Sequence, residues 1–233
     1  MSKLLLSKSI NISSSSSSLG ISEADYYQRY LTIDGHKIAS TGIFCETCLF
    51  LFEILGEPKC NSYSISNLLN QGESNISDSL VTELTAIFPN GRFSVLLLKV
   101  YPRFKKQSNV RGEYYRIGSR EIGFSKKIVE YIVPFQKGET LDESTVNDYM
   151  KELEMGLVPT ALAISFLDIK YPQNDFIYVE RWEMSHYLLD GHHKMLAAAK
   201  AKRPITLISF LSLDRSYSDQ NHIEKLLKVL KSY

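Results

Sequence analysis

The sequence predicts an α+β protein, because strand and helix patterns occur in both halves of the chain. Two near-continuous apolar runs, residues 93–101 and 205–213, are typical of strands that are buried on both faces. Between residues 128 and 213, further strand patterns alternate with helix patterns, which predicts a mixed sheet with helices. A chain of 233 residues with 44% hydrophobic residues is long enough to bury such a core, as one large domain or two small ones.

Residues 1–20 are predicted to be a disordered tail, since they contain the polar serine tract 13–18 and lack the apolar stretch of a secretory signal. Residues 21–101 are predicted to form a smaller N-terminal α/β region. Ser22 and the acidic residues after it predict the start of a short helix, and Asp34-Gly35 predicts a turn. The other elements expected in this region are strands at 30–33 and 93–101, helices at 64–70 and 77–88, and an apolar stretch at 42–52 that fits either a strand or a buried helix.

The segment 102–127 is strongly basic and is predicted to be a linker or a long surface loop. It contains only two acidic residues, Glu113 and Glu121. Such charge is more often a solvated face than a ligand site, although an anion or a partner could be drawn to it. The cations of the segment are Arg103, Lys105, Lys106, Arg111, Arg116, Arg120, Lys126 and Lys127.

Residues 128–233 are predicted to form a second unit, whose signals are sharper. Asp142 is a suitable N-cap for a helix at 141–155, and Gly156 ends that helix. Pro204 ends a second, alanine-rich helix at 192–202. The remaining elements expected here are strands at 128–134, 160–167, 176–179, 186–189 and 205–213, and an amphipathic helix at 218–231.

Charge and hydropathy exclude several classes of function. Lys+Arg 27 against Asp+Glu 26 gives a formal net charge of +1, so no global field attracts nucleic acid, and any such role would require a local patch. No specific nucleic-acid partner is therefore expected. No apolar run approaches the roughly 20 residues that span a bilayer, so no membrane partner is expected. Three cysteines form no disulfide framework, which favours a cytoplasmic location.

The junction at residues 189–197 carries the strongest functional signal. A strand ends at Leu189-Asp190, Gly191 permits a close backbone approach, and a helix begins at once, which brings unpaired N–H groups and a positive dipole end together. His192, His193 and Lys194 add donors at the same corner, which predicts an anion site for a nucleotide phosphate. In the alternative interpretation, Asp190 only caps the helix and the histidines face solvent.

In order and spacing, the helix 141–156, the strand 158–164 and the run 187–194 with its alanine-rich helix resemble the ParB/sulfiredoxin-like domain superfamily. The resemblance implies a mixed sheet with helices, in which the turn at Gly191, His192, His193 and Lys194 binds the phosphates of a nucleotide. Members include sulfiredoxins, nucleotide-hydrolysing ParB proteins and a kinase that acts on free serine. Here the turn has no cysteine, and too few residues follow Leu213 for a helix-turn-helix, so neither sulfinic-acid reduction nor centromere binding is expected.

The leading hypothesis from the resemblance is therefore a nucleotide-binding protein, with ATP or another nucleotide and Mg²⁺. If the protein is catalytic, it is expected to be a phosphotransferase or nucleotide hydrolase that acts on a small molecule. The candidate catalytic residues are Asp190, His193, Glu180 and Glu183, with either glutamate acting as the base if the segment before His186 folds over the site. Surface carboxylates are the commoner alternative for both glutamates. The alternative function is a non-enzymatic module that binds a ligand or a partner.

The cysteines suggest a weaker hypothesis, a structural zinc site. Cys45 and Cys48 form a Cys-x2-Cys pair, and Cys60 and His36 would complete four ligands. The last two ligands are single and scattered, whereas zinc sites usually have a second close pair. The apolar flanks favour cysteines that are buried as small hydrophobic residues. Similarly, Trp182 is expected to be buried under the sheet, with stacking on a ligand as the alternative.

Overall fold

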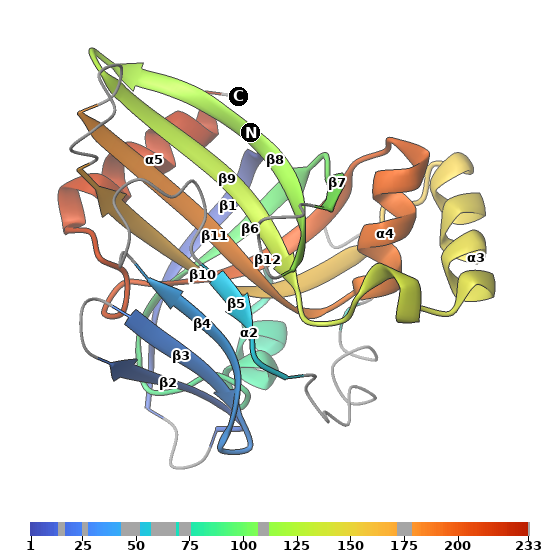
Figure 1. The fold of residues 1–233 in the computed structure, drawn as a ribbon, viewed down its shortest axis with the longest axis horizontal. Helices are drawn as coiled ribbons and strands as arrows, with labels where there is room; N and C mark the ends of the chain where they lie inside the picture. Colours follow the sequence, from blue (N-terminus) through green and yellow to red (C-terminus); the bar gives the residue numbers. More distant parts are fainter. Residues whose placement is uncertain are drawn as a thin grey trace.

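The structure of the protein is a computed structural model, and it combines two β-sheets with helices (Figure 1). The α+β class predicted from the sequence is therefore confirmed, while the ParB/sulfiredoxin-like arrangement stays a prediction. The structure describes residues 1–13, 17–24, 28–42, 52–56, 69, 76–106, 112–171 and 179–232.

The larger sheet, sheet A, has eight strands in the order β1-β6-β12-β10-β11-β9-β8-β7. Within it, β10 pairs in parallel with β12 and β11 pairs in parallel with β9, whereas the other neighbours are antiparallel. The mixed sheet expected from the alternating patterns is thus present. Its strands are β1 (Lys3–Ile12), β6 (Gly91–Val100), β7 (Arg103–Lys106), β8 (Glu113–Gly123), β9 (Lys126–Pro134), β10 (Thr160–Lys170), β11 (Glu180–Asp190) and β12 (Ile205–Ser212).

The smaller sheet, sheet B, is antiparallel in the order β2-β3-β4-β5. The predicted turn at Asp34-Gly35 joins β3 to β4, and both residues have positive φ angles, 48° and 79°. A two-residue turn of this kind requires left-handed backbone, which aspartate tolerates and glycine adopts freely. The strands of sheet B are β2 (Leu19–Ala24), β3 (Gln28–Ile33), β4 (His36–Gly42) and β5 (Phe52–Ile54).

Helices in the predicted positions complete the C-terminal unit. Asp142 caps α3 by accepting from the Thr145 amide, and Gly156 follows its end with a φ of 88°. No helix in the described ranges is long and apolar enough to cross a membrane. The helices are α2 (Asp78–Thr85), the 3-10 turn η1 (Gly138–Thr140), α3 (Glu143–Glu154), α4 (His192–Ala201) and α5 (Gln220–Lys231).

The prediction of a disordered N-terminal tail is wrong. Residues 3–12 form β1, which pairs antiparallel with β6 along its whole length, and Leu4 and Ile12 are buried. The Ser2 amide also donates to the buried Glu130 carboxylate at 2.7 Å. Backbone pairing with a strand some ninety residues away in the chain stabilises β1, and a local sequence pattern does not contain that information.

Two further local predictions fail for the same reason. Ser22 lies in β2 rather than at the start of a helix. The described parts of the basic segment 102–127, expected as a linker or loop, form β7, β8 and the start of β9, which pair antiparallel in sheet A. Strands of sheet A consequently come from the expected tail, the N-terminal region, the expected linker and the C-terminal unit. All but residue 69 of the predicted helix at 64–70, and most of the apolar stretch 42–52, lie outside the described residues.

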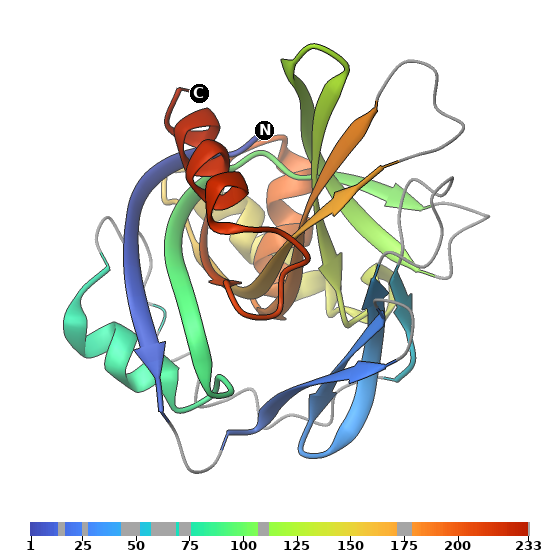
Figure 2. The same cartoon turned by 90° about the vertical axis from the view of Figure 1, so that its left-hand side faces the viewer.

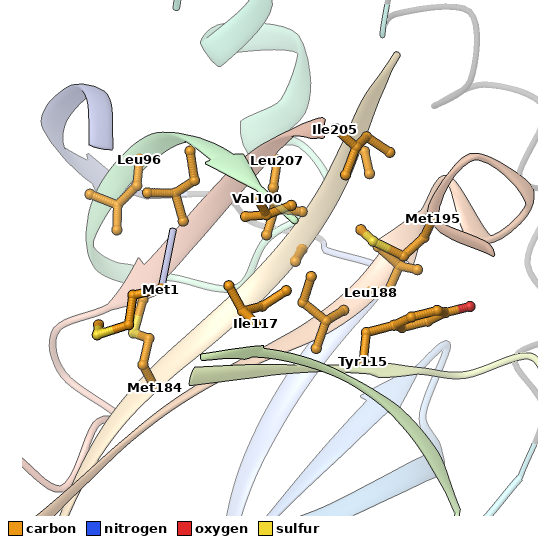
Figure 3. Close-up of a cluster of buried hydrophobic side chains, with 14 of the residues drawn as sticks. Met1, Leu96, Val100, Tyr115, Ile117, Met184, Leu188, Met195, Ile205 and Leu207 are labelled. Carbon is orange, nitrogen blue, oxygen red and sulfur yellow. The ribbon is translucent and has the colours of Figure 1, made fainter. Parts of the chain in front are cut away.

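Sheet A has a hydrophobic core on each face. Helices α3, α4 and α5 cover one face, where Met1, Met184 and Leu188 are among the buried side chains (Figure 3). Sheet B and α2 cover the other face, over Phe166 and Phe210. Figure 2 shows α5 and sheet B on different sides of the curved sheet A. Trp182 is 1% exposed and packs against the ring of His222 in α5, as expected for a buried tryptophan.

A buried ion pair connects the two sheets. Arg29 in β3 donates through both of its terminal nitrogens to the Asp168 carboxylate in β10, and both side chains are almost completely buried. The rings of Phe166 and Tyr217 lie 4.2 and 4.4 Å from the guanidinium carbon. Bidentate bonding and ring contacts together offset the desolvation cost of this pair.

Breaking the Arg29–Asp168 pair is expected to destabilise the protein strongly. Arg29→Met leaves a buried carboxylate without its partner, and we expect a loss of about 3–5 kcal/mol in the free energy of unfolding, measured by urea denaturation. Lys8→Met is the matched control, because Lys8 pairs with Asp78 on the surface, and we expect less than about 1 kcal/mol. Equal losses for the two variants would contradict the proposed role of the buried pair.

Candidate functional site

The structure contains the predicted corner of strand, glycine and helix. β11 ends at Asp190, Gly191 has a φ of 91°, and α4 begins at His192. A Cβ atom at position 191 would lie 2.7 Å from the Ala161 Cβ atom in β10. Glycine is therefore needed twice at this position, for the left-handed backbone and for the close approach to β10.

The start of α4 carries no side-chain cap. Ser77, Asp142 and Asp219 cap α2, α3 and α5 by accepting from backbone amides, whereas Gly191 at the N-cap of α4 has no side chain to do so. The first amides of a helix have no partner within the helix, and the dipole places partial positive charge there. Of the four α-helices in the described residues, α4 alone therefore begins at an N-cap residue that supplies no side-chain acceptor.

His192 has a structural contact that the sequence did not indicate. Its Nε2 atom accepts from the Phe135 amide at 3.2 Å, so the ring joins the end of β9 to the start of α4. Burial, with a smaller effect of His193, lowers the pKa of His192 to about 3. The ring is therefore neutral at physiological pH. It stabilises the corner, and its Nε2 atom is already occupied by a protein donor.

His193 lies between the starts of two helices. Its Nε2 atom accepts from the Asp142 amide at the N-cap of α3 at 3.1 Å, and its side chain is half-buried. A ring that accepts at Nε2 carries its proton at Nδ1, which leaves Nδ1–H as a donor. Asp142 itself bonds Ser144 and Thr145, which lowers the pKa of its carboxyl group to about 2.

Lys194 is directed toward the base of the corner. Its ammonium donates to the Thr160 carbonyl at 3.0 Å and lies 3.9 Å from an Asp190 carboxylate oxygen. Burial lowers the pKa of Lys194, and the charge of Asp190 partly opposes that effect. The structure thus brings Asp190, Gly191, His193 and Lys194 together, while their polar atoms contact different parts of the surrounding protein.

The structure does not bring Glu180 and Glu183 to this corner. Residues 180–190 form one continuous strand, so the segment before His186 is part of that strand and does not fold over the site. At the usual rise per residue, Glu180 lies about 33 Å from Asp190. Glu180 pairs with Lys126 and accepts from the Trp182 indole N–H, and Glu183 pairs with Lys170 at 2.8 Å. The hypothesis that either glutamate acts as a base at the Gly191 turn is therefore wrong.

Glu183 belongs to a second cluster of charges, beneath sheet B. It lies opposite Asp168 in the β10–β11 pairing, with Lys170 and Arg181 on the same face. Burial raises the pKa of Glu183 to about 7, which Lys170 and Arg181 oppose and Asp168 reinforces. No local sequence pattern indicates this cluster, because Arg29 and Asp168 join it from distant strands.

A third polar cluster crosses the interior under α5. His186 bonds the Ser165 hydroxyl at 2.7 Å through Nδ1 and the Glu130 carboxylate at 3.2 Å through Nε2. Burial opposes ionisation of Glu130, but its contacts with His186 and Ser2 hold its pKa below its usual value. The order serine, histidine, acid is that of a hydrolytic triad, but all three side chains are fully buried. We therefore regard this cluster as structural.

The structure bears little on the zinc hypothesis. Cys45, Cys48 and Cys60 lie outside the described residues, and His36 is exposed at the start of β4. Among the described residues, no group of three or more histidine, cysteine, aspartate or glutamate side chains is arranged to hold a metal ion.

Comparison of the chain with protein-family models, with curated proteins and with solved structures finds no match.

Replacement of Gly191 tests the geometry of the corner. Gly191→Ala introduces both a strained φ and a contact with Ala161, and we expect a loss of about 2–3 kcal/mol in the free energy of unfolding. Gly156→Ala has nearly the same φ, 88°, but nothing lies within 4 Å of its new Cβ atom, so we expect only about 1 kcal/mol. Equal losses in urea denaturation would show that the contact with Ala161 is unimportant.

The raised pKa of Glu183 predicts a pH-dependent stability. Because folding favours the protonated form, the stabilisation is complete below the unfolded pKa near 4.5 and is lost as pH rises through about 7. Relative to Glu183→Gln, the free energy of unfolding of the wild type should fall by up to about 3 kcal/mol between pH 5 and pH 8. Glu139→Gln, at an exposed position, is the control and should follow the wild type at every pH.

Proposed function

We propose that this protein binds a nucleotide through its phosphate groups at the start of α4. The observation that carries the proposal is the uncapped amino-terminal end of this helix, placed directly after Gly191 in a left-handed turn. Backbone amides at such a helix end are suitable donors to a phosphate, and the helix dipole favours its charge. The other described α-helices have a carboxylate or hydroxyl group in the corresponding place.

The surrounding side chains favour the binding of an anion over that of a neutral ligand. The first amides of α4 belong to His192, His193 and Lys194. His193 adds its Nδ1–H, because its Nε2 is occupied by the Asp142 amide. Lys194 adds a buried positive charge at the base of the corner. An amide cluster, one imidazole donor and one ammonium together match the charge and the acceptor-only chemistry of a phosphate group.

Mg²⁺ fits this proposal through Asp190. Magnesium that accompanies a nucleotide is commonly held by one or two carboxylates together with the phosphates, and it retains several waters. Asp190 is the carboxylate of the corner, next to Gly191 and 3.9 Å from the Lys194 ammonium. The bound ion would screen the phosphate charge. In this proposal Asp190 holds the ion, and the amides of α4 orient the phosphates.

The geometry supports binding more directly than phosphoryl transfer. Glu180 and Glu183, the expected bases, lie at the far end of β11. A transfer reaction would have to use Asp190 or His193, which already contact Lys194 and Asp142. The alternative function, a module that binds its ligand without turnover, is favoured by this separation.

Nucleotide binding can be tested with one imidazole substitution and a matched control. We expect ATP, ADP or CTP with Mg²⁺ to raise the melting temperature of the wild-type protein, and a ligand at 100 times its Kd stabilises by about 2.7 kcal/mol. His193→Ala should weaken the Kd by tenfold or more, since a hydrogen bond to a charged group contributes about 1.5–3 kcal/mol. His36→Ala, at the exposed start of β4, should bind like the wild type.

The proposal fails if none of the three nucleotides binds in calorimetry, or if His193→Ala and His36→Ala bind equally well. Release of inorganic phosphate in the presence of Mg²⁺ separates the enzyme from the binding module. Binding without phosphate release supports the module, whereas release that disappears in Asp190→Asn supports the enzyme.

A further inference from the structure

Several cations of sheet A have no carboxylate partner among the described residues. Other strand cations are paired, as Lys8 is with Asp78, Arg92 with Asp214 and Lys126 with Glu180. In the part of the chain that the structure describes, a set of five on one face of the sheet forms no ion pair. We call this set the basic band; it consists of Lys3, Lys99, Arg103, Lys105 and Arg116.

The members of the basic band lie on β1, β6, β7 and β8, and four of them form two cross-strand pairs. Lys3 lies opposite Lys99, and Arg103 lies opposite Arg116. The start of β1 approaches β8, since a Cβ atom at Gly118 would lie 2.3 Å from the Met1 nitrogen. Figure 1 shows this approach between the N-terminus and β8. The band therefore lies where the two edges of the curved sheet A, β1 on one side and β7 with β8 on the other, approach each other.

In each of these two pairs, residues of the same charge lie directly opposite each other, which is unfavourable within a fold. Cross-strand pairs of equal charge destabilise an antiparallel ladder. Charges on an edge strand can protect it from unwanted pairing, which would explain Arg103 and Lys105 in β7. That explanation does not extend to Lys99 and Arg116, because β6 and β8 each have a strand on both sides. A bound polyanion would relieve the repulsion in both pairs.

An exposed aromatic ring lies beside these cations. Tyr101 is 49% exposed, although large apolar rings are usually buried. The Lys99 ammonium lies 5.9 Å from the centre of the Tyr101 ring. Arg103 and Lys105 leave β7 on the same side, about 7 Å apart, whereas Phe104 leaves it on the opposite side, where it packs on Tyr115. The surface thus combines positive charges with one stacking platform.

We propose that the basic band binds single-stranded nucleic acid without sequence preference. The cations contact successive phosphates, and a base stacks on Tyr101, which is the usual combination in proteins that bind single strands. An acidic peptide would use the charges but not the ring, so the ring favours nucleic acid. The net charge of +1 allows this role only through a local patch, and the basic band supplies that patch.

The band is separate from the proposed nucleotide site, although β7 packs against α4. None of its five cations contributes to the corner at Gly191. Substitutions in the band therefore leave the nucleotide site intact, and substitutions of His193 leave the band intact. The two proposals can succeed or fail independently.

Fluorescence anisotropy with labelled 20-nucleotide oligo-dT and oligo-U tests the proposal. We expect binding at 50 mM NaCl that weakens with salt, with a slope of about −0.7 in log K per phosphate contact. Arg103→Gln/Arg116→Gln should weaken binding by tenfold or more and reduce the slope by about 1.4. Lys225→Gln/Lys228→Gln removes the same charge from the exposed face of α5 and should change binding less than twofold.

The melting temperatures separate lost contacts from lost folding. Because the Arg103 and Arg116 charges repel each other, their double variant should melt at the wild-type temperature or higher. If it melts lower, Arg103→Gln alone is used, and it should still weaken binding severalfold. Absence of oligonucleotide binding at 50 mM NaCl would overturn the proposal. Equal losses in the control variant, or equal competition by polyglutamate of the same length, would also overturn it.

Discussion

The buried contact between Arg29 and Asp168 determines how the two sheets lie on each other. The two residues are separated by 139 positions in the chain, and the side chains meet in a region from which water is excluded. Removing two charges from water is costly, so the pair is stable only because both carboxylate oxygens, the Arg215 carbonyl and two aromatic rings surround the guanidinium group. The position of sheet B, and the burial of Glu183 beneath it, follow from this contact.

Strand β11 separates two kinds of chemistry that are close in the sequence. Its first half carries Glu180 and Glu183, held by Lys126 and Lys170, and its end carries Asp190 and the glycine turn. A strand rises about 3.3 Å per residue, so neighbours in sequence become distant in space. Carboxylates that look like partners of the turn therefore serve the packing of the sheets. The Gly191 corner is left with donors rather than with a base.

The strands expected to be a tail and a linker close sheet A at its two edges. β1 and β7 pair with β6 and β8, and three of their cations, Lys3, Arg103 and Lys105, form no ion pair with a described carboxylate. The proposed nucleic-acid surface arises from this arrangement, because the start of β1 approaches β8 only when the sheet curves. The nucleotide corner and the basic band thus depend on different elements of one sheet.

The sequence by itself determined the helices α3, α4 and α5, the turn at Asp34-Gly35, and the strand, glycine and helix at residues 189–192, because each depends on residues within a few positions of one another. Only the tertiary structure decided that residues 3–12 and 103–123 are strands, since strand pairing takes its hydrogen bonds from distant segments. It also decided which groups remain available at the corner. His192 and His193 look alike in the sequence, but Phe135 and Asp142 give them different roles, because burial and hydrogen-bond partners are properties of the folded chain.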